Sequence, residues 1–164
     1  TGLRVQLGEE VARQWLEGIE ANNPRSYPNN TTIVQAAGLG EIDIGFVNHY
    51  YLHRFLDSEG EGFGARNFYI GNEDPGALVL TAGAGILKTS KKESEAEQFI
   101  DFLLGREAQE FFANETKEYP LVAGFNPLPE LLPLDQLDPP DINLSDLYDA
   151  EGTLDLMRDV GIIP

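Results

Sequence analysis

The chain of 164 residues contains no cysteine, few basic residues and no long hydrophobic run. Without cysteine, disulfides, thiolate zinc sites and cysteine nucleophiles are all excluded. Only 11 Lys and Arg stand against 28 Asp and Glu, which gives a formal net charge of −17. A charge of that sign repels phosphate backbones and anionic lipid headgroups, so we expect binding neither to nucleic acid nor to a membrane surface.

No apolar stretch approaches the roughly 20 residues that a membrane span needs. The start of the chain, TGLRVQLGEE, lacks the basic and apolar regions of a signal peptide. We therefore expect the chain to begin either as a mature protein or partway through one. The composition that is present, 41% hydrophobic and 10% aromatic, is typical of a globular protein and predicts a packed interior.

Apolar residues at helical spacing predict several helices. The first lies over about 9–21, and the second runs from an N-cap at Asn29 or Asn30 to residue 37. The third is the segment NHYYLHRFL. The fourth runs from a capping box formed by Ser90 and Glu93 to residue 104, and the fifth lies over about 106–114. The last two should form a hairpin on a sheet, with Ala108, Phe111 and Phe112 buried. Beyond 126 the sequence is rich in proline and acid, and predicts short helices held by Leu147, Leu154 and Met157.

Three runs predict strands: IDIGFV at 42–47, NFYI at 67–70 and ALVLTAGAGIL at 77–87. The first leads directly into the NHYYLHRFL helix. Open α/β sheets usually bind ligands at such junctions, where strand ends and helix N-termini converge. Asn29 and Asn30 should lie at another helix N-terminus, where backbone N–H groups and the helix dipole favour an anion.

The stretch VNHYYLHR, residues 47–54, contains the only two histidines, four residues apart. That spacing places His49 and His53 on one helix face and suits zinc. However, no HExxH glutamate lies between them, so a zinc-binding protein or zinc hydrolase would need carboxylates from elsewhere. The other interpretation is that both histidines lie on the helix surface or make hydrogen bonds.

Between the histidines lie Tyr50 and Tyr51. A phenol has a pKa near 10, so it binds a metal at neutral pH only when the cation displaces the proton. Ferric iron, a hard trivalent Lewis acid, can do this. Two adjacent tyrosines are more often one buried and one exposed ring, so the residues alone favour a structural role and leave iron and zinc open.

Several long blocks carry a family resemblance. They are YPNNTTIVQA, GEIDIGFVNHYYLHR, NEDPGALVLTAGAGILKTSKK, AEQFIDFLLGREAQEFFANETKEYPLVAG and INLSDLYDAEGTLDLMRDVGII. Together they resemble the carboxyl-terminal half of periplasmic ferric-ion-binding proteins, the substrate-binding components of iron ABC transporters. The resemblance covers nearly the whole chain.

The resemblance implies an α/β fold of the type II periplasmic-binding-protein kind, with a mixed sheet flanked by helices and two lobes that close on Fe³⁺. Tyr50 and Tyr51 match the adjacent tyrosines that supply two phenolate ligands. Asn30 and Asn48 match the contacts to a synergistic anion, phosphate or carbonate. The family carries iron and performs no chemistry on it, so we expect neither an enzyme nor a catalytic cofactor.

By the same resemblance, 1–80 is a second-lobe segment that carries the tyrosine pair, 81–127 returns to the first lobe, and 128–164 packs back on the second. The amino-terminal half is missing, so the fold should be incomplete and the site half a site. The expected partners are ferric ion, a small anion, an ABC transporter permease, the missing half, and a second copy that pairs through exposed strand edges. The expected location is periplasmic or extracytoplasmic, with a lipid anchor if the source lacks an outer membrane.

Overall fold

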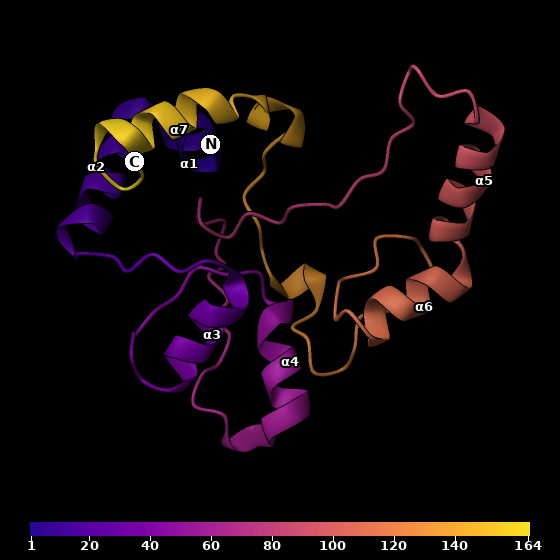
Figure 1. Ribbon diagram of the computed structural model, residues 1–164, viewed down its shortest axis with the longest axis horizontal. Coiled ribbons are helices and arrows are strands. Elements are labelled where there is room, and N and C mark those ends of the chain that lie inside the picture. The colour runs from indigo at the N-terminus through magenta and orange to yellow at the C-terminus, as the bar shows by residue number, and fades with distance from the viewer. The chain divides into compact units, whose positions relative to one another are not determined.

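The computed structural model describes residues 1–164, with seven α-helices and three short 3₁₀ helices (Figure 1). The α-helices are α1 (Gly2–Leu7), α2 (Glu9–Ala21), α3 (Asn30–Gly38), α4 (Tyr50–Glu59), α5 (Glu93–Leu104), α6 (Arg106–Asn114) and α7 (Ala150–Asp159). The 3₁₀ helices are η1 (Gly60–Gly62), η2 (Leu134–Gln136) and η3 (Leu144–Tyr148). None of the helices combines the length and the apolar character that a membrane crossing requires.

Most of the predicted helices are confirmed. The bounds of α2 and α6 agree with the predicted 9–21 and 106–114. The helix α3 begins after Asn29, whose side-chain oxygen accepts the Thr32 N–H at 3.0 Å, so the predicted N-cap is formed. The short helix α1 was not predicted, because its six residues are too few to show a helical period.

The predicted capping box at the start of α5 is wrong. This helix begins at Glu93 after Lys92, and no side chain caps it. The hydroxyl of Ser90 instead accepts the N–H of Lys92 at 3.2 Å, within the turn that precedes the helix. Ser90 therefore stabilises that turn and does not reach the first N–H groups of α5.

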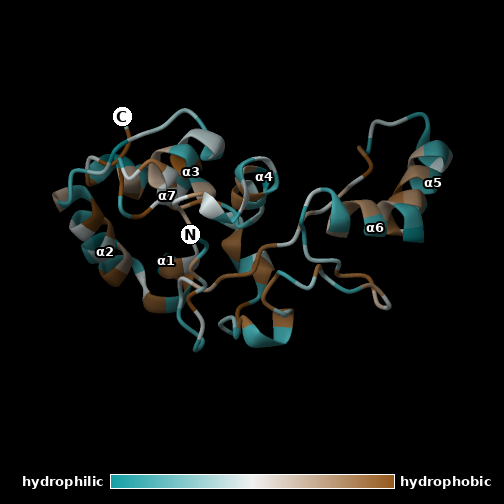
Figure 2. Cartoon of the chain, turned by 90° about the horizontal axis from the view of Figure 1, so that it is seen from below, coloured by the Kyte–Doolittle hydropathy of each residue, from teal (hydrophilic) through white to brown (hydrophobic).

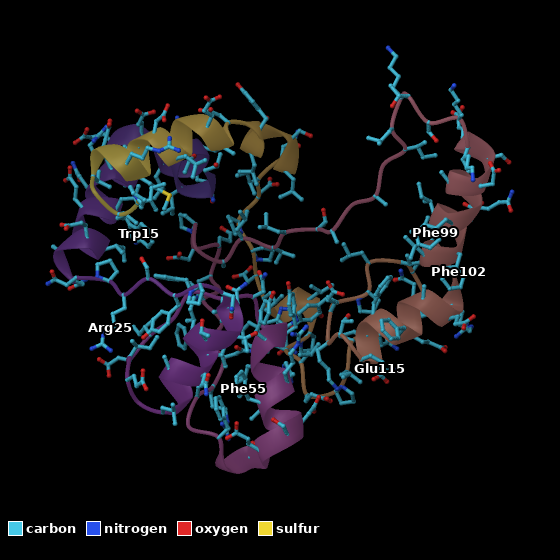
Figure 3. The ribbon with its side chains drawn as sticks, viewed as in Figure 1. Trp15, Arg25, Phe55, Phe99, Phe102 and Glu115 are labelled. Carbon is cyan, nitrogen blue, oxygen red and sulfur yellow. The ribbon has the colours of Figure 1, made fainter.

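The predicted burial of the α6 phenylalanines is also wrong. Phe111 is 54% exposed and Phe112 is half-buried, whereas Ala108, Gln109 and Ala113 are buried. The amide of Gln109 donates to the Leu103 carbonyl at 2.9 Å, which turns the small-residue face of α6 toward the end of α5. Figure 3 shows Phe99 and Phe102 on α5, where both rings are exposed.

The predicted strands do not form. The segments 42–47, 67–70 and 77–87 contain no strand residue and join no sheet. They are drawn as coil in Figure 1, and hydrophobic stretches in coil segments are visible in Figure 2. Their exposed apolar side chains are Ile44, Phe46, Phe68, Ile70, Leu80 and Leu87. A strand needs a neighbour for its N–H and C=O groups. None of these segments pairs with another in this structure, so the mixed sheet of the predicted fold is not confirmed.

The chain divides into two compact units. The first comprises 1–28, 68–80 and 135–164, and contains α1, α2 and α7. Arg4 on α1 pairs with Glu9 at 3.1 Å and with Asp149 at 3.0 Å. Asp149 also accepts the Gly152 N–H at 3.0 Å and so caps α7. One cation therefore holds α1 to the start of α2 and to the start of α7.

The last helices are held by a residue that the sequence did not single out. Leu156 of α7 is 3% exposed, whereas Leu154, which was expected to be buried, is 42% exposed. Leu147 and Met157 are half-buried. The apolar stripe was identified correctly, but α7 is rotated so that a different leucine is at its centre.

The second unit comprises 29–67 and 81–134, and contains α3 to α6. Its core consists of the buried Val34, Leu52 and Phe63, against which Val47, Tyr51, Phe55, Leu56 and Ala65 pack. The rings of Phe55, visible on α4 in Figure 3, and Phe63 stack at 4.8 Å. This core fixes the start of α4. The lobe boundaries predicted from the family, at 80 and 127, stay a prediction.

Candidate functional site

The tyrosine pair lies in the first turn of α4. The Tyr51 N–H donates to the Asn48 carbonyl at 3.2 Å, and the Leu52 N–H donates to the His49 carbonyl at 3.3 Å. In a strand, consecutive side chains would point to opposite faces, but a helix start separates them by a smaller angle. The rings of Tyr50 and Tyr51 accordingly lie side by side, with centroids 4.7 Å apart and planes inclined at 35°.

Asn48 is in direct contact with the pair. Its side-chain amide donates to the phenol oxygen of Tyr50 at 3.0 Å. Burial raises the pKa of Tyr50, the Asn48 donor partly lowers it, and the neighbouring Tyr51 raises it again, so that the net direction is upward. Without a cation this phenol therefore keeps its proton. A metal that bound to this oxygen would have to displace the proton, and the Asn48 donor would then favour the phenolate.

Tyr51 is placed by different contacts. Its ring packs against the core formed by Val34, Leu52 and Phe63. The guanidinium carbon of Arg54 lies 5.3 Å from the ring centroid, within the range of a cation–π contact. The two phenols thus differ in their surroundings, since Tyr50 has an amide donor on its oxygen and Tyr51 has a cation over its face.

The two histidines have no metal-binding arrangement. Nε2 of His49 lies 2.7 Å from the Lys117 carbonyl, and because a carbonyl only accepts, this nitrogen carries the proton. His53 is 8% exposed, and its Nε2 is buried without a partner. Burial lowers the pKa of both histidines. No group of three or more His, Asp and Glu side chains could hold a metal ion, so the zinc alternative finds no ligand set.

Asn30, the other predicted anion contact, is the first residue of α3 and is half-buried. The helices α3 and α4 pack against each other, and Figure 1 shows both beginning at the same end of the pair. The structure therefore joins Asn48 to Tyr50 by a hydrogen bond and carries Asn30 on the adjacent helix.

Three further residues around the pair were not predicted. The amide of Asn67 donates to the His49 carbonyl at 2.9 Å. The ring of Tyr119 lies 5.0 Å from that of His49, and Lys117 supplies the carbonyl that faces His49. These residues lie 18 or more positions from His49 in sequence, so no local pattern could have indicated them.

Comparison with known proteins gives a consistent set of relatives. A family model described as "Bacterial extracellular solute-binding protein" matches residues 1–141. The Fe(3+)-binding periplasmic protein of Serratia marcescens is 32% identical over 160 residues, which cover 95% of this chain and 46% of the relative. The major ferric iron-binding protein of Neisseria gonorrhoeae is 34% identical over 160 residues, which cover 94% and 47%.

A solved structure is similar over almost the whole chain. The crystal structure of iron-bound HitA from Pseudomonas aeruginosa matches with a TM-score of 0.89 and 40% identity, and the match covers 98% of this chain and 52% of that one. This chain therefore has the fold of the corresponding part of that structure. It spans about half the length of the relatives that it matches.

Proposed function

This chain belongs to the bacterial extracellular solute-binding proteins, and on that premise we propose that it carries half of a ferric-ion site that serves iron uptake. The observation that carries the proposal is the adjacent pair Tyr50 and Tyr51, with rings 4.7 Å apart at the start of α4 and an amide donor on one phenol. Relatives named for ferric iron binding support the choice of metal.

The two phenolates are the proposed metal ligands. Each neutralises part of the 3+ charge when the ion displaces its proton, and a hard trivalent cation favours such oxygen ligands over imidazole. Ferric ion is cargo in this scheme, so the protein binds and delivers it without a catalytic step. The role is one of uptake, with location outside the cytoplasmic membrane and delivery to the permease of an ABC transporter.

Asn30 and Asn48 are the proposed contacts to a synergistic phosphate or carbonate. Asn30 lies at the N-terminus of α3, where N–H groups and the helix dipole favour an anion. The Asn48 amide has two N–H donors, and one of them already reaches Tyr50. The second remains available for an anion, so the two roles of Asn48 are compatible.

The remaining ligands and the missing sheet partners belong, in our proposal, to the other half of the fold. Apolar side chains on 42–47 and 77–87 are exposed, including Ile44 at 79% and Leu87 at 77%. A second polypeptide segment that supplied strands would cover them and pair their backbone groups. A chain that lacked such a segment would favour association with a second copy through these exposed edges.

The test is a titration with ferric nitrilotriacetate in phosphate buffer, followed by visible absorption. Nitrilotriacetate leaves coordination positions on the ferric ion open, so even half a site can complete the coordination of the ion. We expect a phenolate-to-iron charge-transfer band in the wild type, a weaker and shifted band in Tyr50→Phe and in Tyr51→Phe, and none in the double variant.

Tyr148→Phe is the matched control, because Tyr148 is 86% exposed and lies in the other unit. It should retain the full band. A colourless wild type, or a band that survives in the Tyr50→Phe, Tyr51→Phe double variant, would show that the tyrosine pair is not the iron ligand.

A further inference from the structure

Both the ring and the backbone carbonyl of His49 are held by hydrogen bonds. Its ring Nε2–H donates to the Lys117 carbonyl at 2.7 Å, and its own carbonyl accepts from Asn67 at 2.9 Å. The ring meets that of Tyr50 edge-on, with centroids 5.5 Å apart and planes at 78°. A residue that lies between Asn48 and Tyr50 in sequence is thus fixed by two distant segments.

The segment that holds the ring is the turn at 115–119, directly after α6. The Glu118 N–H donates to the Phe112 carbonyl at 3.0 Å, which closes the turn onto the helix. Lys117 has a φ of 60°, in the left-handed region that residues with a side chain normally avoid. The strained residue is the one whose carbonyl meets His49.

The same turn contacts α4 in two other ways. Nζ of Lys117 lies 3.8 Å from the carboxylate of Asp57, two turns further along the helix. The ring of Tyr119 packs beside that of His49 at 5.0 Å, while its hydroxyl donates to the Leu132 carbonyl at 2.6 Å. The turn is therefore joined to α4 along its length, and His49 is a contact that joins it to the tyrosine pair.

We propose that the 115–119 turn positions the tyrosine pair, and that His49 is the positioning residue through which it acts. Contacts run from the Lys117 carbonyl to the His49 ring, from that ring to Tyr50, and from the Tyr50 oxygen to Asn48. When the turn holds His49, the phenol of Tyr50 is kept beside Asn48 and Tyr51. The use of this arrangement for iron rests on the proposed function, but the arrangement itself exists without iron.

The iron-free chain provides the first test, by nuclear magnetic resonance. In the wild type we expect the His49 ring proton on Nε2, and nuclear Overhauser contacts between the Tyr50 ring and the Asn48 side-chain amide. His49→Gln places an amide donor near the position of Nε2 and should keep the Tyr50 contacts. His49→Phe keeps the ring but has no donor, and should lose them.

Lys117→Gln is the matched control, because it removes the contact to Asp57 and leaves the backbone carbonyl in place. It should keep the Tyr50 contacts as the wild type does. The proposal is overturned if the wild-type proton lies on Nδ1, if His49→Phe keeps the contacts, if His49→Gln loses them as fully as His49→Phe, or if Lys117→Gln loses them. The first of these outcomes needs no variant to fold.

The second test adds ferric nitrilotriacetate and phosphate. We expect His49→Gln to keep the band position of the wild type, and His49→Phe to shift the band and weaken iron binding by about fivefold or more. A wild type that takes up no iron overturns the proposed function, while the iron-free spectra still decide the role of His49. A coloured wild type with an unshifted His49→Phe band overturns the positioning role alone.

Discussion

At the scale of single residues, the proposed iron site depends on a difference between two neighbouring phenols. Tyr50 has a raised pKa because it is partly buried next to another phenol, and only the Asn48 donor acts in the other direction. A cation that binds at the proposed site must therefore drive proton loss from Tyr50. The strength of the Asn48 hydrogen bond decides how much of the free-energy cost of deprotonating Tyr50 the protein offsets.

Asn48→Ala tests this directly. Removal of the donor should raise the pKa of Tyr50 further and, since one such hydrogen bond contributes about 1 kcal/mol, weaken ferric binding by about fivefold. The ultraviolet absorbance of tyrosinate, recorded against pH, measures the tyrosine pKa values. Subtracting the titration curve of the Asn48→Ala, Tyr50→Phe double variant from that of Asn48→Ala isolates the contribution of Tyr50. Asn22→Ala, at the exposed asparagine that directly follows α2, is the control. An unchanged or lower midpoint in Asn48→Ala would contradict the assigned contact.

The residues themselves show where sequence reasoning reached its limit. The adjacency of Tyr50 and Tyr51 is local, and the helix start that brings their rings together was predicted from the same few residues. The contact of His49 with Lys117 joins segments 68 positions apart. Such a contact depends on tertiary packing. For that reason the sequence left a zinc, a surface and a hydrogen-bonding role open for the histidine and named no partner.

At the scale of elements, helices were predicted well because their signals are local. Asn29 caps α3 through a contact three residues away, and α6 ends where its apolar period ends. The predicted α/β class, an incomplete type II periplasmic-binding-protein-like fold, is supported by the solved structure that this chain matches. Its sheet is not confirmed, since no residue of the chain is a strand residue in this structure. Strand pairing depends on non-local partners, which a local sequence pattern does not specify.

The packing of α3 on the segment after α4 gives a second prediction. A side chain at Gly38, the last residue of α3, would collide with the ring of Phe63, a residue of the unit core. Alanine is usually favoured over glycine in a helix, yet Gly38→Ala should lower the free energy of unfolding by about 1–3 kcal/mol, because the core is overpacked.

Urea unfolding followed by circular dichroism measures this cost. Gly62→Ala is the control in the same unit, because nothing lies within 4 Å of the added carbon, and its effect should stay within about 0.5 kcal/mol. Equal stability of the two variants would show that the Phe63 ring moves aside without a loss of free energy of unfolding.

At the scale of the whole molecule, the buried histidines make the protein sensitive to acid. His49 and His53 both have a pKa lowered by burial from the ordinary value of 6.5, so the unfolded chain binds protons that the folded chain does not. Stability should therefore be complete above about pH 6.5 and should fall as the pH drops toward the folded pKa values. The groups that face His53 include Lys117, which adds to the shift, and Glu130 and Asp57, which oppose it.

Urea midpoints at about pH 7.5 and about pH 5.5 test this sign. We expect a lower midpoint in acid, and a smaller drop in His53→Gln, which does not titrate. If the midpoint rises in acid, the histidines are stabilised in the charged form and their burial is not the dominant effect.

The central claim is that the tyrosine pair holds ferric iron, and the most direct measurement is an anomalous difference map at the iron absorption edge. Crystals of the chain grown with ferric nitrilotriacetate and phosphate would provide it. We predict one strong peak in contact with the phenol oxygens of both Tyr50 and Tyr51. A peak at His49 and His53, or a map without a peak at the tyrosine pair, would contradict the account.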